Sequence, residues 1–405
     1  MTLAAETLIT AAGEATGSDP SPIVSLFWIA AVAALSPLAV RLLRGFVPDV
    51  VILLVAGMVL GPYVLGWAGS GGGVDLLSEL GLGMLFLLAG YELDPRLLRA
   101  KPGRVAWATW LVCLALALGM VHLAARDAGF TTQIAVAIAL TSTALGTLLP
   151  IVKQDGVLDK PLGRAVLAHG AVGELAPIVA MSVLLTSRSP GAAIVVLALF
   201  AVAAGFIALV PRHLLDRAPG LPRLLGQLGG GTTQLPVRVV FLLLLVLMTV
   251  ADVFSLDVVL GAFAAGLILR SLVSEELPEI EESLETIGFG VLIPIFFVVS
   301  GMGIDPAAVA RRPLTWVLFV LAIALARGLP VWFSERFVPH GANLTESRER
   351  AQLALYAATG LPIIVAITQV ATGDGLMSQS LASTLVAAGA TTVLLFPLLA
   401  KAIGT

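Results

Sequence analysis

Apolar runs of about 20 residues follow one another along almost the whole chain, and this spacing limits the folds available to it. A helix of about 20 residues crosses the ~30 Å hydrocarbon core of a bilayer, so each run is a candidate membrane span. Charges, Gly/Pro clusters and capping residues separate the runs and predict thirteen spans. Their approximate limits are 22–43, 47–67, 75–93, 104–125, 131–152, 161–186, 191–211, 236–252, 256–272, 284–303, 313–335, 348–370 and 378–400. Because 58% of the residues are hydrophobic and 12% are charged, we predict an all-α polytopic membrane protein.

The distribution of Lys and Arg predicts the orientation of the spans, because short cytoplasmic loops accumulate basic residues. With the N-terminus outside, eighteen of the 23 basic residues fall in inner loops or at the C-terminus, four fall in outer loops, and Arg327 lies inside a span. We therefore expect a multi-pass protein of the cell membrane with a cytoplasmic C-terminus. Residues 1–21 are expected to form an extracytoplasmic tail, 22–400 the membrane domain, and the Gly/Pro-rich residues 212–235 a cytoplasmic connector within it. No soluble regulatory domain is expected.

Several classes of function are disfavoured by charge and by cysteine content. The net charge of −3 is not that of a protein that tracks a phosphate backbone, so no nucleic-acid partner is expected. The one cysteine, Cys113, cannot build a disulfide framework or a thiolate metal site within one chain. No Asp-rich diphosphate motif, Ser/His/Asp set or His/Cys metal spacing indicates an enzyme, and no cofactor is expected. Membrane lipid is the expected surroundings.

Two predicted spans, 131–152 and 348–370, carry helix-weakening residues at their centres. These residues are Thr141, Ser142 and Thr143 in the first span, and Gly360 and Pro362 in the second. Proline removes an internal hydrogen bond, glycine adds backbone freedom, and hydroxyl groups offer alternative partners, so both helices are expected to break at membrane depth. The two spans cross in opposite directions, as inverted repeats of a transporter require. The alternative is that Pro and Gly only kink these helices, as they often do in membranes.

Two charged residues lie far inside predicted spans: Glu174 about 13 residues into its span and Arg327 about 14. A charge near the bilayer centre costs at least ~2.5–3.5 kcal/mol even on the mildest scales, so it is paired, hydrated or functional. One interpretation is a structural ion pair between Glu174 and Arg327. The other is ion transport by Glu174, with Arg327 tuning its charge.

The transport interpretation has a simple chemical basis, because one carboxylate can hold a proton or a cation but not both. Hard monovalent cations prefer oxygen ligands, which Glu174, the hydroxyls of Thr141, Ser142 and Thr143, and carbonyls freed at the helix breaks could supply. Arg327 cannot release its proton and would act as a fixed positive charge. His169 is either a packed histidine or a proton relay, since it lies five residues before Glu174 and on another helix face.

Several segments resemble the monovalent cation:proton antiporter-2 family, which includes bacterial sodium/proton antiporters and Kef-type potassium efflux systems. The segments are 56–62 (AGMVLGP), 79–93, 139–144 (ALTSTA), 260–266 (LGAFAAG) and 294–302 (PIFFVVSGM). The resemblance implies the sodium/proton antiporter fold, with inverted repeats, two crossed discontinuous helices and a homodimer. It also implies a core domain of about 104–186 and 313–400, a dimerisation domain of about 22–93 and 236–303, and a linker helix at about 191–211.

The sequence departs from this family at the ion-binding positions. Sodium-transporting relatives usually carry an acidic pair, and Kef-type relatives a Gln-Asp, where this chain has Gly173 and Glu174. Many electrogenic relatives carry a Lys where this chain has Arg327. The loss of one carboxylate beside a permanent positive charge leads us to expect electroneutral exchange of one Na⁺ or K⁺ for one H⁺. Two alternatives stay open: a sodium-coupled symporter of an organic anion, and a membrane sensor that transports nothing.

Overall fold

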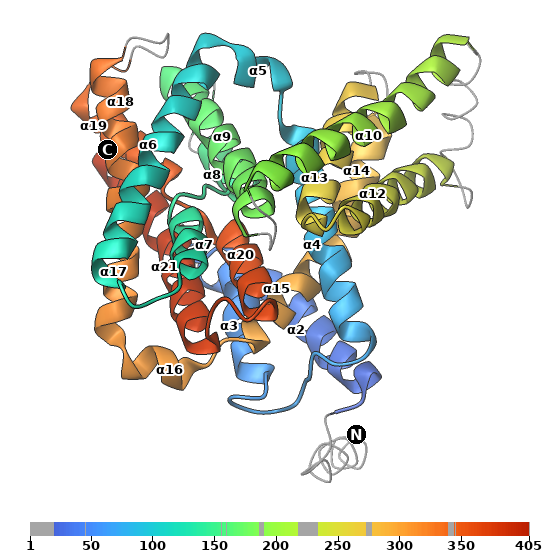
Figure 1. Ribbon diagram of the computed structural model, residues 1–405. Coiled ribbons are helices and arrows are strands. Elements are labelled where there is room, and N and C mark those ends of the chain that lie inside the picture. The colour runs from blue at the N-terminus through green and yellow to red at the C-terminus, as the bar shows by residue number, and fades with distance from the viewer. Residues whose placement is uncertain are drawn as a thin grey trace.

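The computed structural model describes residues 20–44, 46–154, 156–158, 160–185, 190–217, 234–272, 278–338, 344 and 346–404, and every regular element among them is helical (Figure 1). Eleven helical segments of this part of the chain are long and apolar enough to cross a membrane. Two further apolar helices, α3 (Asp49–Leu60) and α13 (Val258–Leu272), are shorter and lie inside predicted spans. The predicted helical membrane fold is confirmed, whereas thirteen full-length spans are not.

Local sequence explains why those two helices are short. Helix α3 ends where Gly61 and Pro62 follow, and proline is a common stop after a helix. Helix α13 begins one residue after Asp257, whose carboxylate accepts a hydrogen bond from the Val259 amide at 2.8 Å. Such a cap sets the first turn of a helix. Most of the predicted tail and most of the predicted connector lie outside the described residues, but helix α10 (Pro190–Arg217) runs beyond its predicted end at 211.

One group of helices packs around buried phenylalanines. Its members are α2 (Pro22–Leu42), α3, α4 (Gly73–Glu92), α12 (Leu235–Val253), α13, α14 (Pro278–Ile287), the π-helical turn η1 (Gly288–Leu292) and α15 (Ile293–Met302). Helices α4 and α13 approach at Gly90 and Gly266, where an added Cβ would overlap a backbone carbonyl of the other helix. Small residues allow such backbone contact between membrane helices. Glycines of the segments that resemble the antiporter family are therefore packing positions.

A second group contains the two broken spans. Its members are α6 (Lys101–Ala124), α7 (Phe130–Leu140), α8 (Leu145–Gln154), α9 (Pro161–Leu184), α17 (Pro313–Ile323), the π-helical turn η2 (Ala324–Gly328), α18 (Leu329–Phe337), α19 (Ser347–Ala357), α20 (Leu361–Gly373) and α21 (Gln379–Gly404). In Figure 1, α6, α17, α18 and α19 lie on one side, and α4, α12 and α13 on the other. Helix α10 contacts both α9 and α13, and the short helices α5 (Pro95–Arg99) and α16 (Pro306–Arg311) lie in connections. The assignment of the first group to dimerisation stays a prediction.

Both predicted helix breaks are confirmed. Residues 141–144 separate α7 from α8, and residues 358–360 separate α19 from α20. The two breaks touch, since the Ala144 amide donates to the Thr359 carbonyl at 2.7 Å and the Ser142 hydroxyl donates to the Gly360 carbonyl at 3.1 Å. An added Cβ at Gly360 would overlap Ser142. Glycine is therefore required at position 360, because the two helix breaks cross so closely there.

Two π-helical turns interrupt otherwise regular spans. Turn η1 ends two residues before Pro294, and turn η2 ends two residues before Pro330. A proline ring clashes with the carbonyl four residues earlier and offers no N–H, so an α-helical turn is locally widened before it. Turn η2 contains Arg327. The sequence analysis did not predict these turns.

Candidate ion-binding site

Glu174 lies on α9 with 5% of its surface exposed and contributes to the wall of a cavity of about 90 Å³. From its own group of helices, Gly146 and Thr147 of α8 and Pro362 of α20 join it. The opposite wall comes from the first group and is mainly apolar, with Leu53, Leu85, Phe86, Leu88, Ala89, Pro294 and Phe297. The cavity therefore lies between the two groups of helices and opens onto the predicted helix breaks.

Two further carboxylates line the same cavity, Asp49 at the start of α3 and Glu92 at the end of α4. One buried oxygen of each, Oδ1 of Asp49 and Oε2 of Glu92, has no hydrogen-bond partner among the described residues. Buried carboxylate oxygens without donors favour a cation, so the cavity collects oxygen ligands of the kind that hard cations prefer.

The sequence analysis missed Asp49 and Glu92 because both lie at the ends of predicted spans, where charges usually face solvent. A usable signal was present: the charge distribution places the start of span 47–67 and the end of span 75–93 at the same membrane face. That criterion finds the pair but cannot tell that both residues line the cavity of Glu174, because only packing decides it.

The three predicted hydroxyl ligands lie at the crossing of the broken helices, outside the cavity wall that the described residues form. Each hydroxyl donates a hydrogen bond to a backbone carbonyl: Thr141 to that of Ile138 at 2.9 Å, Ser142 to those of Ala139 and Gly360, and Thr143 to that of Ala357. Ligation of a cation by these groups would have to replace those bonds. Their role as ligands stays a prediction.

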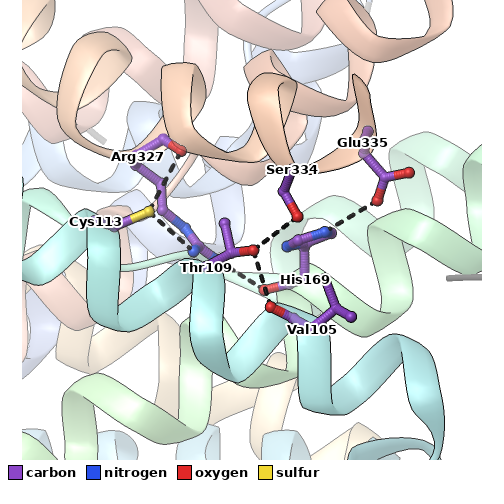
Figure 2. Close-up of polar contacts among 7 residues, drawn as sticks. All are labelled: Val105, Thr109, Cys113, His169, Arg327, Ser334 and Glu335. Carbon is purple, nitrogen blue, oxygen red and sulfur yellow. Dashed lines mark hydrogen bonds and ion pairs between the residues drawn. The ribbon is translucent and has the colours of Figure 1, made fainter. Parts of the chain in front are cut away.

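Arg327 is fully buried, and its guanidinium is held by neutral groups (Figure 2). Nε donates to the Thr143 hydroxyl at 3.1 Å, Nη2 to the His169 carbonyl at 2.7 Å, and Nη1 to the Cys113 sulfur at 3.7 Å. Within the described part of the chain, Arg327 forms no ion pair with Glu174. The structural ion pair between these two residues, one of the two interpretations above, is therefore not formed. A tuning role for Arg327 would act through space, or through Thr143.

The packing around Gly173 explains why no side chain is tolerated next to Glu174. A Cβ built at Gly173 would lie closer to Nη2 of Arg327 and to Oγ1 of Thr143 than real Cβ atoms do. The Thr143 amide also donates to the Gly173 carbonyl at 2.8 Å, which ties the break between α7 and α8 to α9. The space that a side chain at position 173 would take is thus occupied by the Arg327 guanidinium and the Thr143 hydroxyl.

His169, whose carbonyl accepts from Arg327, makes its side-chain contact with another helix. Its Nε2 is 3.1 Å from Oε1 of Glu335 on α18 (Figure 2). Both side chains are buried, with 1% and 2% of their surfaces exposed. The sequence analysis missed Glu335 because it falls on the last residue of predicted span 313–335. The contact links α9 to α18 and does not involve Glu174. A relay role for His169 stays a prediction.

Comparison with known proteins assigns the family. The sequence model of the transmembrane sodium/hydrogen exchanger family matches residues 29–403. The chain belongs to this family. Relatives include a putative Na⁺/H⁺ antiporter, YjbQ, of Bacillus subtilis, 25% identical over 78% of this chain and 53% of the relative. Another is the glutathione-regulated potassium-efflux system protein KefC of Escherichia coli, 27% identical over 78% of this chain and 50% of KefC. The chain spans about half the length of these curated relatives.

The fold of this exchanger-family chain also matches a solved structure. The sodium proton antiporter MjNhaP1 from Methanocaldococcus jannaschii superimposes with a TM-score of 0.56, covering 98% of this chain and 96% of that chain at 16% identity. The predicted sodium/proton antiporter fold and the resemblance to cation:proton antiporters are both confirmed. The family is one of transporters, which agrees with the expectation that the chain is not an enzyme.

Proposed function

We propose that this protein is a secondary transporter that exchanges a monovalent cation, Na⁺ or K⁺, for H⁺ by alternating access. The observation that carries the proposal is a buried carboxylate, Glu174, in a cavity between two groups of helices. The names of the relatives include both cations, sodium for YjbQ and MjNhaP1 and potassium for KefC. Because relatives of both kinds occur, Na⁺ and K⁺ are the two candidate cations for this protein.

The proposed mechanism is competition at Glu174. A cation entering the cavity meets Asp49 and Glu92, whose unpartnered oxygens favour positive charge, and reaches Glu174. Binding of the cation displaces the proton, and protonation on the other side of the membrane displaces the cation. Because the cavity lies between the two groups, movement of one group against the other would change which side it faces.

The proposal also includes the orientation of the chain in the membrane and its assembly as a homodimer. We place the N-terminus outside, and the ends of α3 and α4 that carry Asp49 and Glu92 at the cytoplasmic face, from the distribution of Lys and Arg. The cavity would then be entered from the cytoplasm. The protein would act as a homodimer in the cell membrane, with the group that contains α3, α4 and α13 forming the contact between subunits.

A first test measures exchange in proteoliposomes with a pH-sensitive dye after addition of Na⁺, K⁺ or Li⁺. We expect proton movement with at least one cation, and a Glu92→Gln variant in which the concentration for half-maximal response rises. A rise of roughly tenfold would correspond to about 1.4 kcal/mol of lost charge attraction. Glu282→Gln on the exposed face of α14 is the matched control and should respond like the wild type. Sodium-dependent uptake of an added organic anion without proton movement would indicate a symporter and contradict the proposal.

A second test concerns stoichiometry. If Glu174 is the one carboxylate that holds proton and cation in turn, and Arg327 keeps its charge, one cation should replace one proton, so no net charge crosses the membrane. We expect the initial exchange rate to be unchanged when a membrane potential of either sign is imposed on the liposomes. A current during cation addition, or a rate that follows the potential, would show that more than one proton moves for each cation.

A further inference from the structure

A second and larger hollow lies on the outside of the second group of helices, between α6 and α18. It is a groove of about 820 Å³ and is separate from the cavity at Glu174. Val112 and Leu116 of α6 form one wall, and Leu329, Phe333 and Phe337 of α18 form the other. All five side chains are exposed. An apolar groove of this size on a membrane-spanning face is a site for an apolar chain.

One end of the groove is strongly basic. Lys101 and Arg104, at the start of α6, line it and are exposed. Neither forms an ion pair with a carboxylate in the part of the chain that the structure describes. Two unpaired cations at the end of an apolar groove are complementary to an amphiphile with a negative head group.

The length of the groove matches one leaflet of a bilayer. Its lining on α6 runs from Lys101 to Leu116, a rise of about 22 Å at 1.5 Å per residue. Half of a bilayer, head groups included, is about 20–22 Å thick. The basic end lies at the membrane face that the charge distribution predicts to be cytoplasmic, and the apolar end lies near the bilayer centre.

We propose that this groove binds an anionic phospholipid of the cytoplasmic leaflet. Lys101 and Arg104 hold its phosphate, and one acyl chain lies along α6 between Val112 and the aromatic side chains of α18. The choice of leaflet rests on the orientation given with the proposed function, whereas the groove itself takes no part in cation exchange.

The floor of the groove connects this site to the network around Arg327. The hydroxyls of Thr109 and Ser334 lie 2.8 Å apart and join α6 to α18 (Figure 2). The next residue after Ser334 is Glu335, the partner of His169, and α6 also supplies Cys113, which contacts the Arg327 guanidinium. A lipid that bridges α6 and α18 therefore stabilises the pair of helices that encloses Arg327.

The test uses the full chain, purified in detergent and stripped of lipid, with added phosphatidylglycerol or phosphatidylcholine. Bound lipid is counted by native mass spectrometry, and the midpoint of thermal unfolding is followed in parallel. We expect phosphatidylglycerol to bind and to raise the midpoint, and phosphatidylcholine to do so much less. In Lys101→Ala/Arg104→Ala, binding of phosphatidylglycerol should weaken roughly 30-fold, from the usual contribution of a basic residue near an anionic lipid. Arg41→Ala, an exposed basic residue at the end of α2, should bind as the wild type does.

A second pair of variants tests the acyl-chain part of the groove. Ala108 lines the groove and is exposed, so Ala108→Trp should fill it and reduce lipid binding to the level of the double variant. Leu111 is exposed on the same helix but does not line the groove, so Leu111→Trp should leave binding unchanged. Equal binding of the two lipids, or unchanged binding in both the double variant and Ala108→Trp, would overturn the proposal. So would wild-type protein that retains no lipid but co-purifies with a helical membrane partner.

Discussion

Replacement of Glu174 by glutamine is expected to reduce cation-dependent proton movement in proteoliposomes to the level of protein-free liposomes. Glutamine keeps the size of the side chain but can neither bind a proton at that oxygen nor neutralise a cation. Among the three carboxylates of the cavity, Glu174 is the one placed far inside its span and buried on α9. Because exchange requires one group that holds proton and cation in turn, the loss should be complete for every cation that the wild type transports.

One further variant and a stability measurement make this result specific. Glu174→Asp keeps the carboxylate and moves it back by one methylene, so it should retain exchange with a weaker apparent affinity for the cation. The thermal unfolding midpoint of Glu174→Gln should match that of the wild type or exceed it, since a buried charge is removed. A Glu174→Gln protein that is folded and exchanges as fast as the wild type would refute the assignment of this residue.

Replacement of Gly173 by alanine is expected to destabilise the protein by about 1–3 kcal/mol, the usual cost of overpacking, and to abolish exchange. The added methyl group would overlap the Arg327 guanidinium and the Thr143 side chain. The guanidinium could swing away, but Thr143 could not, because its amide is bonded to the Gly173 carbonyl itself and its hydroxyl to the Ala357 carbonyl. The break between α7 and α8 would therefore have to move relative to α9.

The matched control is Gly119→Ala on α6, where an added Cβ would meet open space. Alanine has the better helix propensity, so this variant should be as stable as the wild type or more stable by up to about 1 kcal/mol. Thermal unfolding and exchange are measured for both variants in the same lipid. If Gly173→Ala unfolds at the wild-type temperature and exchanges normally, the packing of Thr143 and Arg327 against α9 does not limit transport.

Several features of this protein are determined by local sequence. A continuous apolar run of span length must form a helix in the membrane. Lipid offers the backbone N–H and C=O groups no hydrogen-bond partners, so they must pair within the segment. The two helix breaks are equally local, since Gly360, Pro362 and the hydroxyls of 141–143 weaken the helix in which they stand. The depth of Glu174 and Arg327 follows from counting residues along their spans. These properties therefore could be predicted before any contact was known.

The contacts among these residues depend on tertiary structure. Glu335 pairs with His169 across 166 positions of the chain, and Glu92 lines the cavity of Glu174 from a helix of the other group. The burial of a residue at the end of a span depends on what packs over that end, which no local pattern reports. The same limit explains why an ion pair of Arg327 with Glu174 stayed open as one interpretation, whereas Thr143, His169 and Cys113 hold the guanidinium in the structure. Sequence by itself determined a helical membrane fold with two broken spans and one deep carboxylate. Packing decided which charges share the cavity of that carboxylate, because neighbouring helices decide which side chains come together.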